Sequence, residues 1–185
     1  MPFGFGDTTS RLARRAASGD RRAFRELYRA LYPLVARYVR RRIREPADAE
    51  DIVARAFQRV VEKLDTFDPA RGNAEAWALT ITRNLVRNEY RRRDRKPVVS
   101  LDAGNHTEPA ATDPEPASHD LEELNGVLGD LTDAQREAVV LRHVVGLPMR
   151  EVALTMGCPD GTAKSHISRG LAQLRSTLDE KEASR

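Results

Sequence analysis

Hydrophobic residues recur at three- and four-residue steps along most of the chain, a period that predicts helices. Runs rich in Val, Ile, Tyr or Thr with a two-residue period are scarce, so we expect no strand. The first helix in the N-terminal part follows Asp20, which can cap it, and Pro33 is expected to kink or interrupt it. Its apolar face is formed by Phe24, Leu27, Leu31, Leu34 and Tyr38.

The segment "EPADAED" opens a second helix with the most regular apolar pattern in the chain. Its stripe consists of Ala49, Ile52, Val53, Ala56, Phe57, Val60, Val61 and Leu64. Acidic residues lead its other face, where they favour a helix start, and Arg55 and Arg59 follow. A third helix is expected to begin near Ala74 and to end in an arginine cluster.

The C-terminal part is predicted to hold four short helices. The first lies in "LEELNGVLGDL", and "TDAQ" at 132–135 has the form of a capping box that starts the next. That helix stops at Gly146, and helices over 148–156 and 160–178 follow. The last two, joined by a turn at Gly157, have the arrangement of a helix-turn-helix.

Charge and composition divide the chain between these two parts. Residues 81–96 hold seven Lys or Arg against two acids, whereas residues 97–135 hold nine acids and neither Lys nor Arg. Residues 97–120 contain four prolines and few residues to bury, so they are predicted to form a flexible acidic linker. We therefore expect an all-α protein with two small helical domains, 10–96 and 121–178, on either side of that linker.

Several functional classes are disfavoured by the same composition. One cysteine, Cys158, cannot form an internal disulfide and is expected to pack as a small apolar side chain. No apolar run is long enough for a membrane span, and no signal peptide is recognisable, so a cytoplasmic protein is expected. The chain has no phosphate-binding glycine loop and no His–Cys metal spacing, so we predict no enzyme, cofactor, metal or small-molecule substrate.

Two helices carry the residue types that contact DNA. On the last helix, short hydroxyl side chains and basic side chains project away from Ala163 and Ile167, and this mixture is suited to the major groove of DNA. The candidate contacts there are Thr162, Lys164, Ser165, His166 and Arg169. On the third helix of the N-terminal part, arginines at four-residue steps suit a phosphate backbone, and the neighbouring asparagines suit base edges. The candidates there are Arg83, Arg87, Arg91, Asn84 and Asn88.

Aromatic residues separate the two parts further, because all of them lie at or before residue 90. Only the N-terminal part can therefore stack bases, as binding of an opened single strand requires. Trp77 is the candidate for this role, and ordinary core packing is the equally weighted alternative. The two parts thus indicate duplex reading by one and handling of an opened strand by the other, with the linker allowing both sites to be bound together.

Three blocks resemble, in order, the bacterial sigma factors of the extracytoplasmic-function (ECF) group, which keep only sigma regions 2 and 4. "DAEDIVARAFQRVVEKLDTF" resembles the part that docks on core RNA polymerase, and "AWALTITRNLVRNEYRRRDR" the part that melts and reads the start-proximal (−10) promoter element. "LTDAQREAVVLRHVVGLPMREVALTMGCPDGTAKSHISRGLAQLR" resembles region 4, whose last helix reads the upstream (−35) element.

The resemblance implies roles for individual residues. Asp48, Asp51 and Arg55 would contact the polymerase, with its clamp helices and flap as docking sites. Asn84 would help to capture a flipped base, with loop 68–75 forming part of the pocket. The family usually has Gln-Glu where Ala54 and Arg55 stand, and Arg at the position of His166. These departures bear on the docking contacts and on the upstream sequence that is read.

A transcription initiation factor that brings core RNA polymerase to promoter DNA is therefore the leading interpretation. A stand-alone helix-turn-helix regulator is the alternative, but it leaves the basic-aromatic third helix unexplained. The resemblance also implies an anti-sigma partner, which could hold the protein at the membrane. We further expect the two halves to pack together, or against an inhibitor, so that the isolated protein binds promoter duplex poorly.

Overall fold

The computed structural model describes residues 7–94 and 126–183, and within these ranges all regular secondary structure is helical. The predicted all-α fold is confirmed. The predicted linker, residues 97–120, lies outside the described residues. We call residues 7–94 the N-terminal half and residues 126–183 the C-terminal half.

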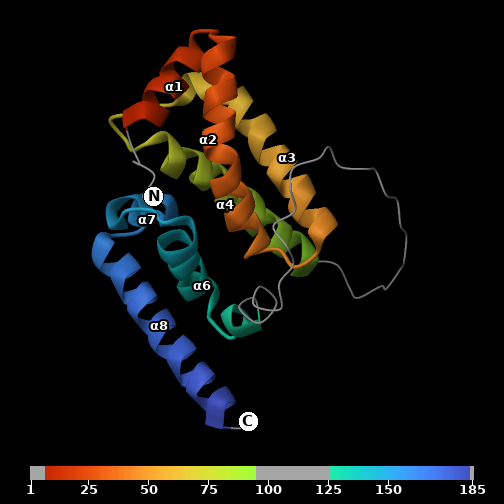
Figure 1. Cartoon of the computed structure of the whole chain (residues 1–185), viewed down its shortest axis with the longest axis vertical. Coiled ribbons are helices and arrows are strands. Elements are labelled where there is room, and N and C mark those ends of the chain that lie inside the picture. The colour runs from red at the N-terminus through yellow and green to blue at the C-terminus, as the bar shows by residue number, and fades with distance from the viewer. Residues whose placement is uncertain (1–6, 95–125, 184–185) are drawn as a thin grey trace.

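The N-terminal half is a bundle of four helices, with α1 packed across one end of α2 (Figure 1). A short 3₁₀ turn, η1, follows α3. The bounds are α1 Asp7–Ala17, α2 Arg21–Arg40, α3 Pro46–Glu62, η1 Leu64–Thr66 and α4 Ala74–Asp94. Helix α1 was not predicted from sequence. Its alanines Ala13 and Ala16 are buried, and its Ser10 hydroxyl accepts a hydrogen bond from the Ala74 amide at 3.3 Å.

Helix α2 is capped as predicted, because the Asp20 carboxylate accepts from the amides of Arg22 and Ala23. The expected interruption at Pro33 is wrong, since α2 continues through it to Arg40. Pro33 is exposed, so water can serve the carbonyl left without its helical donor. The packing of α2 against α1, α3 and α4 offsets the missing hydrogen bond.

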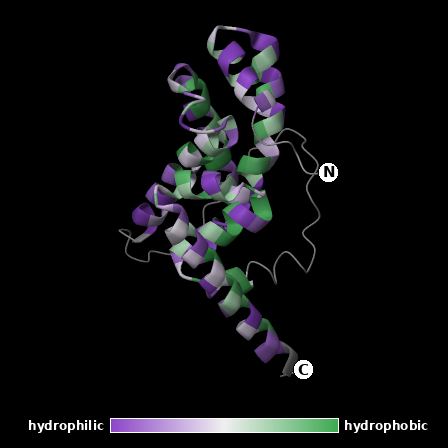
Figure 2. Ribbon diagram, turned by 90° about the vertical axis from the view of Figure 1, so that its left-hand side faces the viewer, coloured by the Kyte–Doolittle hydropathy of each residue, from purple (hydrophilic) through white to green (hydrophobic). Residues whose placement is uncertain are grey.

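The core of this half forms where the apolar faces of the helices meet (Figure 2). Leu27, Leu31 and Tyr38 of α2 are almost fully buried, as is Ile52 of α3. One member of the predicted α3 stripe is wrong: the Val61 side chain is 53% exposed. Val60 already occupies the inward position at that turn, so Val61 points outward one residue later.

The C-terminal half contains α6 Asp133–Val139, the π-helical turn η2 Val140–Val145, α7 Met149–Met156 and α8 Asp160–Ala183. A helical turn at 126–129 precedes them. The capping box is confirmed: the Gln135 amide donates to the Thr132 hydroxyl, and the Thr132 amide donates to the Gln135 side chain. Gly146 and Gly157 end their helices in the left-handed conformation, with φ of 88° and 66°.

The two halves pack against each other in this structure. Helix α7 lies beside α4, and η2 lies against α2 (Figure 1). The expectation that the halves pack together is therefore met.

The capping box supplies a test of the C-terminal half. Thr132→Ala removes the acceptor for the Gln135 amide and should destabilise the protein by about 1 kcal/mol. Urea unfolding monitored by circular dichroism measures this. Ser176→Ala, on the exposed part of α8, is the matched control and should change stability by less than about 0.5 kcal/mol. An equal loss in both variants would contradict a capping role for Thr132.

Candidate nucleic-acid interface

Helix α8 presents its predicted DNA contacts to solvent. Ala163 and Ile167 are buried against the rest of the C-terminal half, as expected. Thr162, Lys164, Ser165 and Arg169 are exposed, and His166 is half-buried. The turn before α8 holds Cys158, which is half-buried, and burial raises the pKa of its thiol. The partial burial of Cys158 agrees with a packing role for this side chain. The exposed residues of α8 leave one face of that helix open to a ligand.

Gly170 lets α8 approach α6 closely. A Cβ at this position would lie 2.9 Å from Cγ2 of Val139, closer than two carbon atoms can pack. The absence of a side chain therefore fixes α8 directly against α6.

Helix α4 carries a row of exposed polar residues along one face. We call Asn84, Arg87, Asn88 and Arg91 the α4 stripe, because they are spaced at three and four residues and are all exposed. The structure thus keeps most of the predicted start-proximal contacts together on one surface.

Arg83 does not belong to this open surface. Its side chain is only 14% exposed, and its Nε donates to the carboxylate of Glu137 on α6. Glu137 is itself 5% exposed and also accepts from the Tyr38 hydroxyl at 3.5 Å. We call Arg83, Glu137 and Tyr38 the Glu137 cluster. Burial raises the pKa of the Tyr38 phenol, so the hydroxyl remains a donor.

A second ion pair joins the halves close to this cluster. The fully buried Arg42 side chain donates through Nη2 to the Asp133 carboxylate at 2.6 Å and through Nη1 to the Asp133 carbonyl at 3.2 Å. The Arg42 guanidinium also lies 5.4 Å from the centroid of the Tyr90 ring, a cation–π distance. Neither Glu137 nor Arg42 was a candidate from sequence, because one lies in a helical apolar run and the other among several arginines.

Helix α7 contacts loop 68–75, the predicted base pocket, at Gly72, whereas residues 68–71 are exposed. A Cβ at Gly72 would lie 3.2 Å from Oε2 of Glu151 and 3.4 Å from Cδ1 of Leu154. The Thr155 hydroxyl donates to the Ala76 carbonyl at 3.4 Å. The C-terminal half therefore packs against this loop and against the start of α4.

Trp77 lies on the border between core and surface. It is half-buried and packs against Phe67, with the ring centroids 5.4 Å apart. The packing interpretation therefore accounts for its position, and a stacking role stays a prediction.

The predicted polymerase-docking residues are placed on α3, where each has an ionic partner. The Arg55 guanidinium donates to the Asp51 carboxylate at 3.2 Å, and both are exposed. Asp48 accepts from Arg93 at the far end of α4. Arg93 and Arg92 also donate to Glu89, and the Arg92 hydrogen bond, followed by that from Arg93, lowers the Glu89 pKa to about 2.

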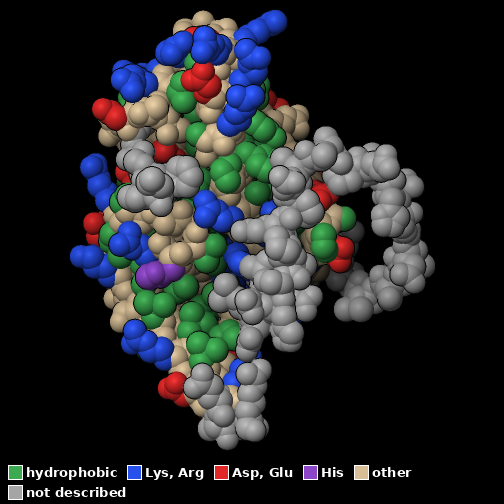
Figure 3. Space-filling model, viewed as in Figure 1, with side chains coloured by type: hydrophobic (Ala, Val, Ile, Leu, Met, Phe, Trp, Pro, Cys, Tyr) green, Lys and Arg blue, Asp and Glu red, His purple; other side chains and the backbone are tan. Residues whose placement is uncertain are grey.

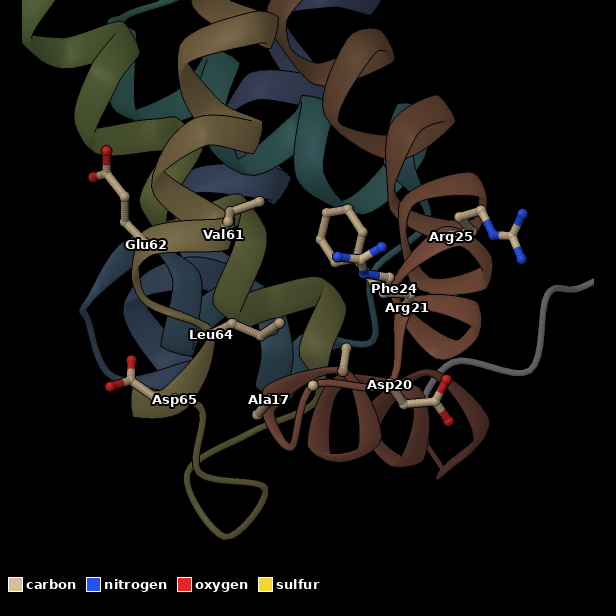
Figure 4. Close-up of a pocket in the computed structure, with 11 residues that line it drawn as sticks. Ala17, Asp20, Arg21, Phe24, Arg25, Val61, Glu62, Leu64 and Asp65 are labelled. Carbon is tan, nitrogen blue, oxygen red and sulfur yellow. The ribbon is translucent and has the colours of Figure 1, made fainter.

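An apolar groove beside α3 was not anticipated from sequence. Phe24 of α2 points toward Val61 of α3, and the groove of about 730 Å³ between them extends to Leu64 (Figure 4). Nearby, the 40% exposed Tyr28 packs on Phe57 with ring centroids 4.5 Å apart. The exposed Val61 was the available signal, but its helical spacing made it look like core. Lys and Arg side chains gather over α1 and the start of α2, at this end of the molecule (Figure 3).

Comparison with known proteins adds the family. The sequence model of Sigma-70 region 2 matches residues 27–96, and that of Sigma-70 region 4 matches residues 121–174. The ECF RNA polymerase sigma factor EcfG of Rhodopseudomonas palustris is 34% identical over 131 residues, which cover 70% of this chain and 71% of that protein. The chain belongs to the ECF sigma factors. It is therefore a transcription initiation factor of RNA polymerase, and the stand-alone regulator does not account for the region 2 match.

Other sigma factors match this chain over most of its length. The RNA polymerase sigma factor CnrH of Cupriavidus metallidurans is 32% identical over 178 residues, covering 91% of this chain and 93% of CnrH. The solved structure of CnrH with the cytosolic domain of CnrY superimposes with a TM-score of 0.75 at 29% identity, covering 94% of this chain and 99% of that one. RpoE from Bartonella quintana, solved with the anti-sigma factor NepR, gives 0.69 at 28% identity, covering 84% and 96%.

Two further properties hold for the part of the chain that the structure describes. Within residues 7–94 and 126–183, no helix has the length and apolar character needed to span a membrane. The same ranges contain no group of His, Cys, Asp and Glu placed to hold a metal ion.

The Glu137 cluster can be tested by removing one charge. We call the packing of the two halves against each other the closed arrangement. Glu137→Gln leaves Arg83 without an anionic partner and should destabilise the closed arrangement by about 2 kcal/mol, which is roughly a 30-fold shift toward separated halves. Small-angle scattering should then show an increased radius of gyration. Glu26→Gln removes one charge from an exposed pair on α2 and should leave it unchanged. An unchanged radius in both variants would mean that Glu137 does not hold the halves together.

Proposed function

We propose that this sigma factor divides promoter recognition between two surfaces. The exposed face of α8, with Thr162, Lys164, Ser165, His166 and Arg169, binds the upstream element in the major groove. The α4 stripe binds the opened start-proximal element. The observation that carries this proposal is the exposure of both surfaces on helices whose opposite faces are buried, so that each helix is held rigidly behind its contacts.

The α4 stripe offers two kinds of contact to a single strand. Arg87 and Arg91 are one turn apart and suit successive phosphates. Asn84 and Asn88 present amides that can pair with a base edge, and Asn84 lies nearer to loop 68–75. We assign base capture to Asn84, with Arg83 and Trp77 completing the site once α7 has moved away. The protein performs no bond chemistry of its own, and binding energy drives strand opening.

The polymerase is proposed to dock on α3 and on the groove beside it. Asp48, Asp51 and Arg55 supply charged contacts, and exposed Val61 and Tyr28 supply apolar ones. An interface needs an apolar centre within a polar rim, and this surface contains both. Arg55 stands where the family usually has Glu, and in the free protein its positive charge is paired with the negative charge of Asp51 on the same helix.

The closed arrangement is proposed to be an inactive state of the free protein. It pairs Arg83 with Glu137 and places α7 against loop 68–75, so the start-proximal site is incomplete. An anti-sigma factor is the expected partner for keeping the protein inactive, in keeping with the NepR complex of the Bartonella quintana RpoE. Such a factor could also hold this protein at the membrane.

The proposal is tested first by transcription in vitro with core RNA polymerase and genomic promoters. Promoter-specific transcripts that depend on the protein are expected. DNA binding without any association with core polymerase would overturn it.

Asn84→Ala should weaken promoter opening about tenfold or more while leaving the affinity for core polymerase unchanged, because a lost base contact costs about 1–3 kcal/mol. Permanganate footprinting of the opened strand and a polymerase pull-down measure the two properties. Asn88→Ala, one turn further along the α4 stripe, is the matched comparison and should lose less opening. Equal loss of opening and polymerase binding would contradict the assigned role.

The isolated protein should bind promoter duplex poorly, and Glu137→Gln should bind it more tightly because Arg83 becomes available to phosphates. Fluorescence anisotropy at fixed salt compares the two. Tight duplex binding by the unmodified protein alone would count against an inactive closed state.

A further inference from the structure

Glu89 is an acid in the core-facing row of α4. The row runs through Leu79, Thr82, Val86 and Glu89 at three- and four-residue steps, and every member is buried. The Glu89 side chain is only 5% exposed. Burying a carboxylate is costly unless it is paired, so its partners determine what it does.

The partners of Glu89 are two arginines from the next helical turn. Arg92 donates through Nε at 2.9 Å and through Nη2 at 2.6 Å, which is a bidentate pair. Arg93 donates through Nε at 3.1 Å, and its Nη2 donates to Asp48 on α3. Both guanidinium groups are thus drawn back toward the helix and its α3 neighbour.

The other two arginines of this helix end, Arg87 and Arg91, differ from this pair. All four side chains are exposed, but within residues 7–94 and 126–183 neither Arg87 nor Arg91 makes a hydrogen bond or an ion pair. They lie on the α4 stripe with Asn84 and Asn88. Of the four arginines at 87–93, two are compensated and two are free, and the free ones share a single face.

We propose that Glu89 is a positioning residue for promoter DNA: by retaining Arg92 and Arg93, it confines the phosphate contacts of α4 to the stripe. This inference rests on the proposed role of α4 in binding the opened strand. A strand held only along the stripe passes directly beside the Asn84 and Asn88 amides. A helix end with four free arginines would instead attract phosphates around its whole circumference and weaken that alignment.

The salt dependence of binding separates this role from a purely structural one, because it reports how many phosphates the protein neutralises. The full-length protein is titrated into a fluorescent single-stranded oligonucleotide of mixed sequence at several salt concentrations. Each added phosphate contact steepens the plot of log K against log salt by about 0.7. Glu89→Gln frees Arg92, whereas Arg93 keeps its ion pair with Asp48, so the variant should steepen the plot by about 0.7. Glu26→Gln makes the same charge change at the exposed Arg22 pair and should leave the slope unchanged.

Single arginine variants test the proposal without disturbing Glu89. Arg87→Ala and Arg91→Ala should each flatten the slope by about 0.7, whereas Arg92→Ala and Arg93→Ala should leave it near the unmodified value. The triple variant Glu89→Gln, Arg92→Ala, Arg93→Ala should return to the unmodified slope.

Two results would overturn the inference. One is an unchanged slope in a folded Glu89→Gln protein, and the other is a flattening of the slope by Arg92→Ala equal to that by Arg91→Ala. Equal steepening by Glu26→Gln would place the strand over α2 instead. Failure of the unmodified protein to bind the oligonucleotide at low salt would be a failure of the proposed function itself.

Discussion

The contact between Arg83 and Glu137 is the interaction on which this arrangement of the two halves depends. Both side chains are largely buried, so each charge would lose its counter-charge away from solvent if the other were absent. The pair lies between α4, on which the start-proximal contacts are proposed, and α6, which packs against α8. A hydrogen-bonded ion pair therefore links α4 directly to α6 and, through α6, to α8, and Arg42 with Asp133 reinforces the link from just beyond the end of α2.

Under the proposed function, acidic side chains would decide which arginines of α4 are available to DNA. Glu137 occupies Arg83 from the other half of the protein, whereas Glu89 retains Arg92 and Arg93 from within the same helix. Separation of the halves would break the first contact, whereas the second lies within α4 and does not depend on how the halves are arranged.

The fold could be predicted from sequence where local signals act alone. The capping box at Thr132, the Asp20 cap and the glycine turn at Gly157 are determined by neighbouring residues, and each is confirmed. The predicted interruption at Pro33 is wrong because packing against three other helices keeps α2 continuous, whereas the alternative of a kink stays a prediction. Val61 was misjudged because a helical stripe widens with length, and only the positions of the neighbouring helices decide which edge is covered.

The site was predictable in type but not in pairing. Exposed candidates on α8 and the α4 stripe follow from helical periodicity, because the same spacing that buries one face exposes the other. The partners of Arg83, Arg92 and Arg93 do not follow, since Glu137 lies 54 residues away in sequence and Glu89 looks like an ordinary surface acid. Charge pairing of this kind depends on where helices cross.

Gly170 has a mechanical consequence. Because Gly170 has no side chain, α8 packs closely on Val139 and Gln135 of α6, the helix that carries Glu137. If the proposed opening separates Glu137 from Arg83, this close packing favours movement of α6 and α8 together. Withdrawal of α7 from loop 68–75 and reorientation of α8 toward the upstream element would be a single motion, so uncovering one DNA site also re-aims the other.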